Sequence, residues 1–155
     1  MPRPPRDQEP GYFHLGTRGN NKGDIYRTAD DRLVFLALLN RIIRQREWAL
    51  HCWCLMTNHY HLVLETRWAN LSDGMQRLNG VYAKWFNAFY SQTGHVFERR
   101  FWTNRVEDED ELRDVAEYVI YNPVRAGLCD DPWDWRWLGA PILGGRPEAR
   151  QPIVH

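Results

Sequence analysis

The sequence predicts one α+β domain, built from an antiparallel sheet with helices packed on one face of it. Three observations lead to this fold class. The chain has 155 residues, of which 43% are hydrophobic, enough for a sizeable core. Several short segments alternate apolar and polar residues with the period of two that strands require. Longer segments place apolar residues at helical spacing, and the order is strand, helix, strand, strand, helix, strand, helix.

Residues 12–17 form the first predicted strand, with Phe13 and Leu15 on one face and Tyr12 and His14 on the other. A turn with two cations and two amides follows, with the sequence Arg18-Gly19-Asn20-Asn21-Lys22-Gly23. Such a turn is suited to touching phosphate, and it is equally typical of a solvated loop.

A helix is predicted next, with Asp30 or Asp31 as its N-cap and an end near Arg46. The apolar segment 49–56 and the alternating segment 58–65 then follow, separated by a tight turn. Two strands joined in this way indicate a β-hairpin.

In the second half of the chain, a helix begins at Asn70 and carries a long apolar and aromatic stripe. A strand is predicted over 102–106. The last helix runs from about Asp110 to Tyr121 and ends before Pro123. This order of elements suits the ferredoxin-like, RRM-like arrangement, in which the first strand and the second strand of the hairpin lie side by side.

Composition suggests one folded domain over 11–138, between a proline-rich, charged arm at 1–10 and a mobile tail at 139–155. The three cysteines form no disulfide framework. No apolar segment is long enough to span a membrane, and no secretory signal is visible. A cytoplasmic setting is therefore expected.

Charge is balanced overall but segregated along the chain. Twenty basic residues oppose twenty acidic ones, so net charge gives no indication of a nucleic-acid partner. Between residues 77 and 105, however, a basic block contains Glu98 as its one acid, and seven acids follow between Glu107 and Glu117. The basic block is the candidate for contact with a phosphate backbone. It consists of Arg77, Lys84, Arg99, Arg100 and Arg105.

Two histidines stand out in the segment 58–65. His59 and His61 are two residues apart on a strand, so their imidazoles share one face. If the first strand lies next to this one, His14 is expected on the same face. Two imidazoles can bind a divalent metal but need further ligands.

The last helix offers a partner for these histidines. Tyr118 and Asn122 are one helical turn apart. An amide oxygen can join two imidazoles around Mg²⁺ or Mn²⁺, and a phenol beside such a metal can attack a phosphodiester. Because strand and helix are distant in sequence, their convergence is a hypothesis.

Several ordered motifs resemble those of the single-tyrosine HUH transposases, and within them the branch of REP-associated tyrosine transposases. The resemblance covers roughly residues 12–137. The motifs are Arg18-Gly19-Asn20-Asn21, Asn58-His59-Tyr60-His61-Leu62, Met75-Gln76-Arg77-Leu78-Asn79, Gly94-His95-Val96-Phe97 with Arg100, and Tyr118-Val119-Ile120-Tyr121-Asn122-Pro123-Val124-Arg125-Ala126-Gly127. A His-x-His pair alone is a weak signal, whereas the ordered set is specific.

The resemblance implies a nuclease and strand transferase that acts on single-stranded DNA next to a hairpin. It implies that His59, His61 and Asn122 bind a divalent metal, Mg²⁺ or Mn²⁺. It also implies that Tyr118 becomes linked to a 5′ phosphate while a 3′-OH is released, so the last helix is the catalytic one. On a helix, Tyr121 points about 60° further from Asn122 than Tyr118 does, and Tyr121 is expected to pack.

The resemblance and the charge pattern together predict a DNA-binding surface. The predicted contacts are Arg18, Asn20, Asn21, Arg77, Lys84, Arg99, Arg100, Trp102 and Arg105. Among the aromatics, Trp102 or Phe101 can stack on an unpaired base. Two departures from the family pattern are Thr57, where proline is common, and the pair Glu98-Arg99 in place of glutamine-glycine. The first alters a turn, and the second affects DNA contacts.

Two alternatives stay open at this point. One is a structural zinc site formed by neighbouring histidines and cysteines, namely His51, Cys52, Cys54, His59 and His61. In that region Cys52 and Cys54 are expected on one strand face and His51 on the other. The second alternative is a non-catalytic protein that binds DNA or RNA hairpins. A monomer is expected from the resemblance, and a dimer is the alternative.

Overall fold

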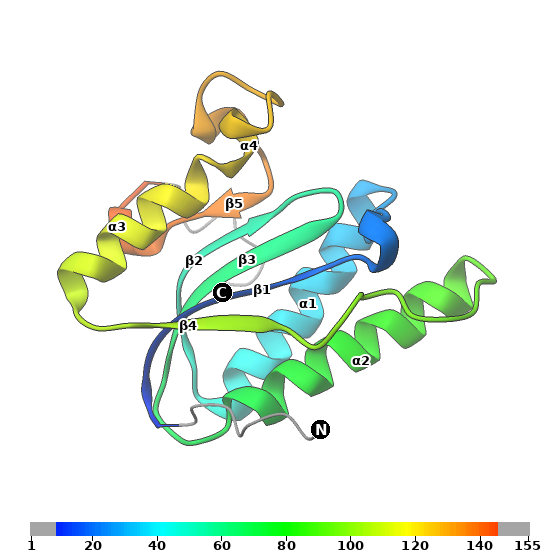
Figure 1. Cartoon of the computed structure of the whole chain (residues 1–155), viewed down its shortest axis with the longest axis horizontal. Helices are drawn as coiled ribbons and strands as arrows, with labels where there is room; N and C mark the ends of the chain where they lie inside the picture. The colour runs from blue at the N-terminus through cyan, green and yellow to red at the C-terminus, as the bar shows by residue number, and fades with distance from the viewer. Residues whose placement is uncertain (1–8, 146–155) are drawn as a thin grey trace.

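The structure is a computed structural model and describes residues 9–145. One five-stranded antiparallel sheet has the strand order β4-β1-β3-β2-β5 (Figure 1). The strands are β1 (Gly11–Arg18), β2 (Ala49–Leu55), β3 (His59–Thr66), β4 (Trp102–Val106) and β5 (Leu138–Gly139). The α-helices are α1 (Ala29–Arg46), α2 (Leu71–Phe89), α3 (Glu109–Ile120) and α4 (Asn122–Arg125). Short 3₁₀ turns are η1 (Asn20–Lys22), η2 (Pro132–Asp134) and η3 (Pro141–Leu143).

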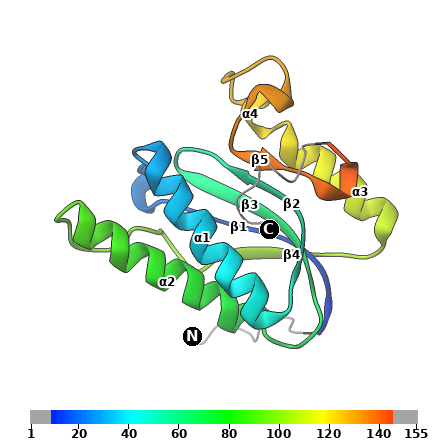
Figure 2. The same ribbon diagram turned by 180° about the vertical axis from the view of Figure 1, so that it is seen from behind.

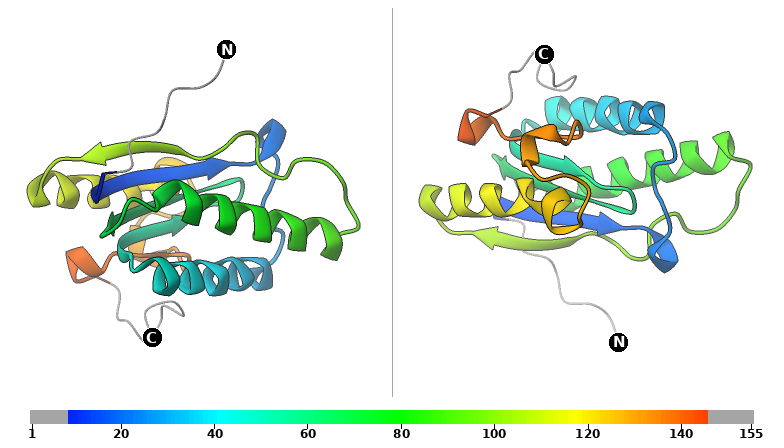
Figure 3. Two further views of the ribbon diagram at one scale, coloured as in Figure 1. Left: turned by 90° about the horizontal axis from the view of Figure 1, so that it is seen from below. Right: turned by 90° about the horizontal axis from the view of Figure 1, so that it is seen from above.

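The predicted α+β fold with an antiparallel sheet is confirmed, but its helices do not all share one face. Helices α1 and α2 pack on one face of the sheet (Figure 2), and this face carries Tyr60, Leu62 and Leu64. Helix α3 packs on the opposite face (Figure 1), in one cluster with Val63 and Cys54. In Figure 3, α2 lies in front of the strands in the left view, and α3 lies in front of them in the right view.

A β-bulge in β2 explains why a second apolar surface exists for α3. The register with β3 shifts between Leu50 and Cys52. Before the shift Leu50 faces α1 and α2, and after it Cys52 faces α3. One extra residue reverses the alternation of sides. His51 therefore contacts Glu65 and Tyr12 on the α3 side, and the expectation that it faces away from Cys52 was wrong.

The histidine strand β3 lies in the middle of the sheet, between β1 and β2. Its pairing with β1 sets Gly16 opposite His61 and Arg18 opposite His59. On the other side of β1, Gly16 is opposite Trp102 of β4. The predicted neighbourhood of the first strand and the histidine strand is therefore confirmed, as is the hairpin of β2 and β3.

The N-terminus of α1 is capped by a residue other than the two aspartates considered above. Thr28 is the N-cap, and its hydroxyl accepts a hydrogen bond from the Asp31 amide, while the Asp31 carboxylate accepts one from the Thr28 amide. This reciprocal arrangement is a capping box. Asp31 therefore stabilises the helix start from its third position, and Asp30 takes no part in the cap.

Behind the histidines, three buried or partly buried side chains close a ring of hydrogen bonds between the sheet and α2. The Thr17 hydroxyl donates to the Tyr60 oxygen (2.8 Å), and the Tyr60 hydroxyl donates to Asn79 Oδ1 (2.6 Å). Asn79 Nδ2 donates back to Thr17 Oγ1 (3.1 Å). The three side chains thereby satisfy one another, and they link β1, β3 and α2.

The folded domain extends past residue 138, where the tail was expected to begin. Leu138 and Ala140 are fully buried, and η3 packs on α3 and β2. Trp135 donates its indole hydrogen to the Leu55 carbonyl (3.0 Å), which ties this segment to β2. Residues 146–155 of the expected tail and 1–8 of the expected arm lie outside the described residues. In the described part of the chain, no helix is long and apolar enough to cross a membrane.

Candidate functional site

Three imidazoles lie in a row on the α3 side of the sheet. His59 and His61 alternate with the core residues of β3, and their ring centroids are 5.2 Å apart. His14 of β1 stacks on His61 with centroids 5.3 Å apart, and its Nε2 lies 3.0 Å from His61 Nδ1. The shared face predicted for these three histidines is confirmed.

Hydrogen bonds determine which ring nitrogen of His59 is available. Its Nδ1 lies 2.8 Å from Asn58 Oδ1, and the Asn58 amide nitrogen donates to the Lys22 carbonyl (3.2 Å). Since Asn58 Oδ1 can only accept, Nδ1 of His59 carries the hydrogen and Nε2 keeps its lone pair. In His61, Nδ1 faces His14. When Nδ1 donates this hydrogen bond, Nε2 is the nitrogen that stays available to a metal, as in His59.

The environment keeps these imidazoles neutral, as metal ligands must be. Burial lowers the pKa of His14 to about 4. Burial, together with the neighbouring His14, His59 and two arginines, lowers the pKa of His61 to about 3. The pKa of His59 is also lowered, first by burial and then by the charge of Arg18.

Trp102 covers the end of this row because Gly16 leaves room for it. Its indole meets His14 edge-on at a centroid distance of 4.8 Å and His61 at 5.4 Å. A Cβ on Gly16 would come within 2.7 Å of Trp102 Cζ2 and would also meet the Tyr60 carbonyl oxygen. The missing side chain at Gly16 therefore positions the indole against the histidines. Trp102 remains 38% exposed, whereas Phe101 is buried in the core and cannot stack on a base.

Helix α3 brings Tyr118 to the same place. An open hollow is lined by Tyr118, Asp114 and Val115 of α3 together with His14, His61, Trp102 and Asn104 of the sheet. The ring of Tyr118 is 6.5 Å from that of His14, centroid to centroid, and the side chain is 56% exposed. The helix is held there by Leu112, Ala116 and Val119, which are buried against the sheet. The exposed phenol of Tyr118 and the neutral imidazoles of His14 and His61 thus face the same open hollow.

Asn122 lies just past the end of α3, where Pro123 interrupts the backbone bonding. Because proline has no amide hydrogen, the Val119 carbonyl lacks its usual helical donor. The Asn122 side-chain nitrogen donates to that carbonyl instead (3.2 Å). Within residues 9–145 its Oδ1 accepts no hydrogen bond, so the amide oxygen is available as a ligand. No hydrogen bond joins Asn122 to His59 or His61.

The donor set bears on which metal this region can hold. Within the described residues, no group of three or more His, Cys, Asp and Glu side chains is arranged to bind a metal ion. Cys52 and Cys54 are fully buried, and burial raises the pKa of both thiols. The zinc alternative therefore finds no ligand cluster. Two imidazoles and an amide oxygen remain as the donors.

Comparison with known proteins identifies the family. The family model of IS200-like transposases matches residues 9–122, well over half of the chain. The chain belongs to the IS200-like transposase family. The resemblance inferred from the ordered motifs is thereby confirmed.

Among curated relatives of this chain, a Haemophilus influenzae protein provisionally named a REP-associated tyrosine transposase is 28% identical over 94 residues, covering 53% of each chain. The REP-associated tyrosine transposase of Escherichia coli is 22% identical over 97 residues, covering 61% of this chain and 56% of that protein. The matched region thus spans about half the length of these relatives. A solved REP-associated tyrosine transposase bound to a REP hairpin has the same fold, with a TM-score of 0.73, 16% identity, and coverage of 89% of this chain and 82% of that one.

One of the predicted DNA contacts, Arg18, lies beside the histidines. Arg18 ends β1 opposite His59, and the turn with Asn20 and Asn21 follows it. The segment that carries Arg99 and Arg100 is joined to this turn by backbone bonds. These bonds run from the Asn20 amide to the Val96 carbonyl and from the Glu98 amide to the Arg18 carbonyl. Arg18 therefore lies beside His59, whereas Arg99 and Arg100 line a hollow with Asn79 and Gly80 of α2.

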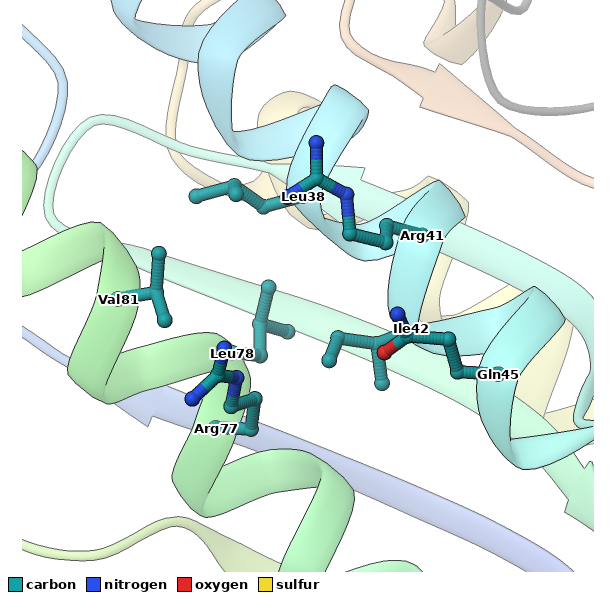
Figure 4. Close-up of a pocket in the computed structure, with 7 residues that line it drawn as sticks. All are labelled: Leu38, Arg41, Ile42, Gln45, Arg77, Leu78 and Val81. Carbon is teal, nitrogen blue, oxygen red and sulfur yellow. The ribbon is translucent and has the colours of Figure 1, made fainter.

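Other predicted contacts lie on the opposite face. Arg77 and Lys84 belong to α2, and Arg77 lines a small hollow between α1 and α2 (Figure 4). Arg105 packs over the Phe13 ring and donates to the Glu9 carbonyl (2.6 Å). The structure does not bring these three residues together with the histidines.

Three residues of the site were missed in the sequence. Asp114 precedes Tyr118 by one helical turn, and that spacing alone could have indicated it. Asn104 follows Trp102 by two residues on a strand and shares its face. Arg125 stacks on Tyr118, which no spacing rule within α3 foresees. Tyr121 was expected to pack but is 46% exposed.

Proposed function

We propose that this transposase is a single-stranded DNA nuclease and strand transferase with Tyr118 as its nucleophile. The observation that carries the proposal is that Tyr118 of α3 and His61 of β3 line one open hollow. The exposed phenol is accessible to a DNA strand, and the neutral imidazoles lie beside it. Tyr121 is exposed too, but it does not line this hollow.

The proposed step is an exchange at phosphorus. The Tyr118 oxygen forms a bond to the phosphorus of the scissile phosphodiester and loses its proton to water. The bond from phosphorus to the 3′ oxygen breaks, and that oxygen takes up a proton to leave as a 3′-OH. The DNA on the other side stays attached through a 5′ phosphotyrosine. Attack by a 3′-OH on this linkage reverses the step and joins strands.

His59, His61 and Asn122 are the residues proposed to hold a divalent metal. The Nε2 atom of His59 keeps its lone pair, His61 can present the same atom, and the Asn122 Oδ1 is not engaged. A hard ion such as Mg²⁺ or Mn²⁺ accepts such a mixed set, and when bound it polarises the phosphodiester.

The proposed substrate is a single strand with a hairpin near the cleavage point. A solved protein of the same fold is bound to a REP hairpin. In this chain, Arg18 lies next to His59, and Trp102 offers an aromatic face beside His61. Arg99 and Arg100 follow Glu98, whose amide is bonded to the Arg18 carbonyl. Cations for a backbone and an aromatic for a base are the combination that single strands require. A cytoplasmic monomer remains the expected state.

A 3′-labelled single strand with a hairpin tests the proposal. Incubation with Mn²⁺ should give a labelled adduct that survives denaturation, and EDTA should prevent it. Tyr118→Phe should abolish the adduct, whereas Tyr121→Phe is the matched control that keeps it. Hairpin binding without any adduct would contradict the nuclease proposal and favour a non-catalytic hairpin-binding protein.

A further inference from the structure

Arg125 makes two contacts with Tyr118 from the far side of the helix break. Its guanidinium carbon lies 4.0 Å from the centroid of the Tyr118 ring. Its Nη2 donates a 2.7 Å hydrogen bond to the Tyr118 backbone carbonyl. A guanidinium stacked on a ring and bonded to the same residue restrains both the ring and the main chain.

Helical geometry persists through the break and explains how residue 125 reaches residue 118. Tyr121 keeps right-handed helical angles, and the Arg125 amide donates to its carbonyl (2.9 Å). Tyr118, Asn122 and Arg125 therefore have the spacing of successive turns on one helix face. The short helix α4 thus carries both the proposed amide ligand and the stacked guanidinium.

The charge of Arg125 is not neutralised by an acid. Within residues 9–145, Arg125 forms no ion pair. Because no carboxylate competes for it, the Arg125 guanidinium can stack on the Tyr118 ring.

From these contacts we infer that Arg125 is a positioning residue for the nucleophile, which holds the Tyr118 ring toward the hollow. The inference rests on the proposed function of Tyr118. Tyr118 is 56% exposed, so without the guanidinium its ring can adopt other rotamers in solvent. The plain alternative is that Arg125 only caps the last turn of α3, where basic side chains commonly bond free carbonyls.

An NMR measurement tests the contact without any reaction. Protein with ¹³C in the tyrosine ε positions gives a Tyr118 signal, identified by its loss in Tyr118→Phe. Arg125→Met removes the guanidinium and keeps most of the chain length, so the Tyr118 signal should shift. Arg113→Gln is the control, because Arg113 also bonds a backbone carbonyl, that of Ile142 (3.0 Å), away from Tyr118. An unmoved Tyr118 signal in Arg125→Met would overturn the inference.

Single-turnover adduct formation at saturating hairpin DNA tests the role. Arg125→Met should slow the reaction between about tenfold and about a hundredfold, because a misplaced nucleophile loses its alignment. Hairpin affinity should change by less than about threefold, and Arg125→Lys should recover part of the rate. If Arg125 only caps the helix, Arg125→Met should lower the thermal stability but form the adduct as fast as Arg113→Gln does. That result would overturn the inference. If wild-type protein formed no adduct, the proposed function itself would fail, while the NMR shift would still decide on the contact.

Discussion

His14 and His61 form a pair across neighbouring strands, with Nε2 of His14 3.0 Å from Nδ1 of His61. This contact can fix the hydrogen of His61 on Nδ1 and direct Nε2 toward a ligand. Such outer partners of a metal-binding histidine commonly tune affinity tenfold to a hundredfold. His14 is therefore part of the site although it is not one of the proposed ligands.

His14→Phe should weaken Mn²⁺ binding by about tenfold to a hundredfold, because His61 loses the partner that orients it. Calorimetric titration with Mn²⁺ measures the change. His51→Ala is the matched control, since His51 bonds Glu65 outside the histidine row. Equal Mn²⁺ affinity in His14→Phe and wild type would refute this role of His14.

Gly16→Ala should damage both stability and the site. The new methyl group meets the Tyr60 carbonyl and the Trp102 indole, so β1 and β3 must separate or the indole must move. We expect a loss of about 1–3 kcal/mol in the free energy of unfolding, measured in urea. Gly80→Ala in α2 is the control, because a Cβ there has open space and should stabilise the helix by up to about 1 kcal/mol. Similar unfolding curves for both variants would contradict this account of Gly16.

Tyr60→Phe tests the hydrogen-bonded ring behind the histidines. The variant leaves Asn79 Oδ1 without its buried donor and Thr17 without its acceptor. A buried unsatisfied group costs about 1–3 kcal/mol, so the free energy of unfolding should fall by that amount. Tyr12→Phe, on the other face of the sheet, should change it by less than about 0.5 kcal/mol. An unchanged free energy of unfolding in Tyr60→Phe would show that Asn79 and Thr17 find other hydrogen-bond partners, such as water.

Acid should destabilise the metal-free protein through its buried imidazoles. In the folded state the pKa is about 4 for His14 and about 3 for His61, below the ordinary 6.5. Between these values the unfolded chain binds more protons, so stability is complete above about pH 6.5 and falls as the pH drops below it. Urea unfolding in EDTA at several pH values measures the slope. His14→Gln should flatten it between pH 6.5 and 4, and an unchanged slope would contradict the assignment.

The sequence predicted what depends on local periodicity. Alternation along residues 59–64 placed His59 and His61 on one face and Tyr60 and Leu62 in the core, as the structure shows. The side of the sheet taken by α3 was not predictable, because it depends on one extra residue in β2 that reverses which side chains face it.

For the candidate site, periodicity predicted that Tyr118 and Asn122 share a helix side, but not what surrounds them. Arg125 reaches Tyr118 only because the backbone stays helical through Pro123, where proline usually ends a helix. The basic block likewise looked continuous in sequence, yet Arg77 and Arg105 project from the face opposite the histidines. A count of charges along the sequence cannot show that the sheet separates these arginines from the histidines.

Peptide mapping of the protein–DNA adduct tests the central claim most directly. Trypsin should release residues 114–125 as one peptide that contains both Tyr118 and Tyr121. After the DNA is digested to a single nucleotide, fragment ions should place the 5′-linked nucleotide on Tyr118. A nucleotide on Tyr121, or an unmodified peptide alongside cleaved DNA, would contradict the assignment of Tyr118 as the nucleophile.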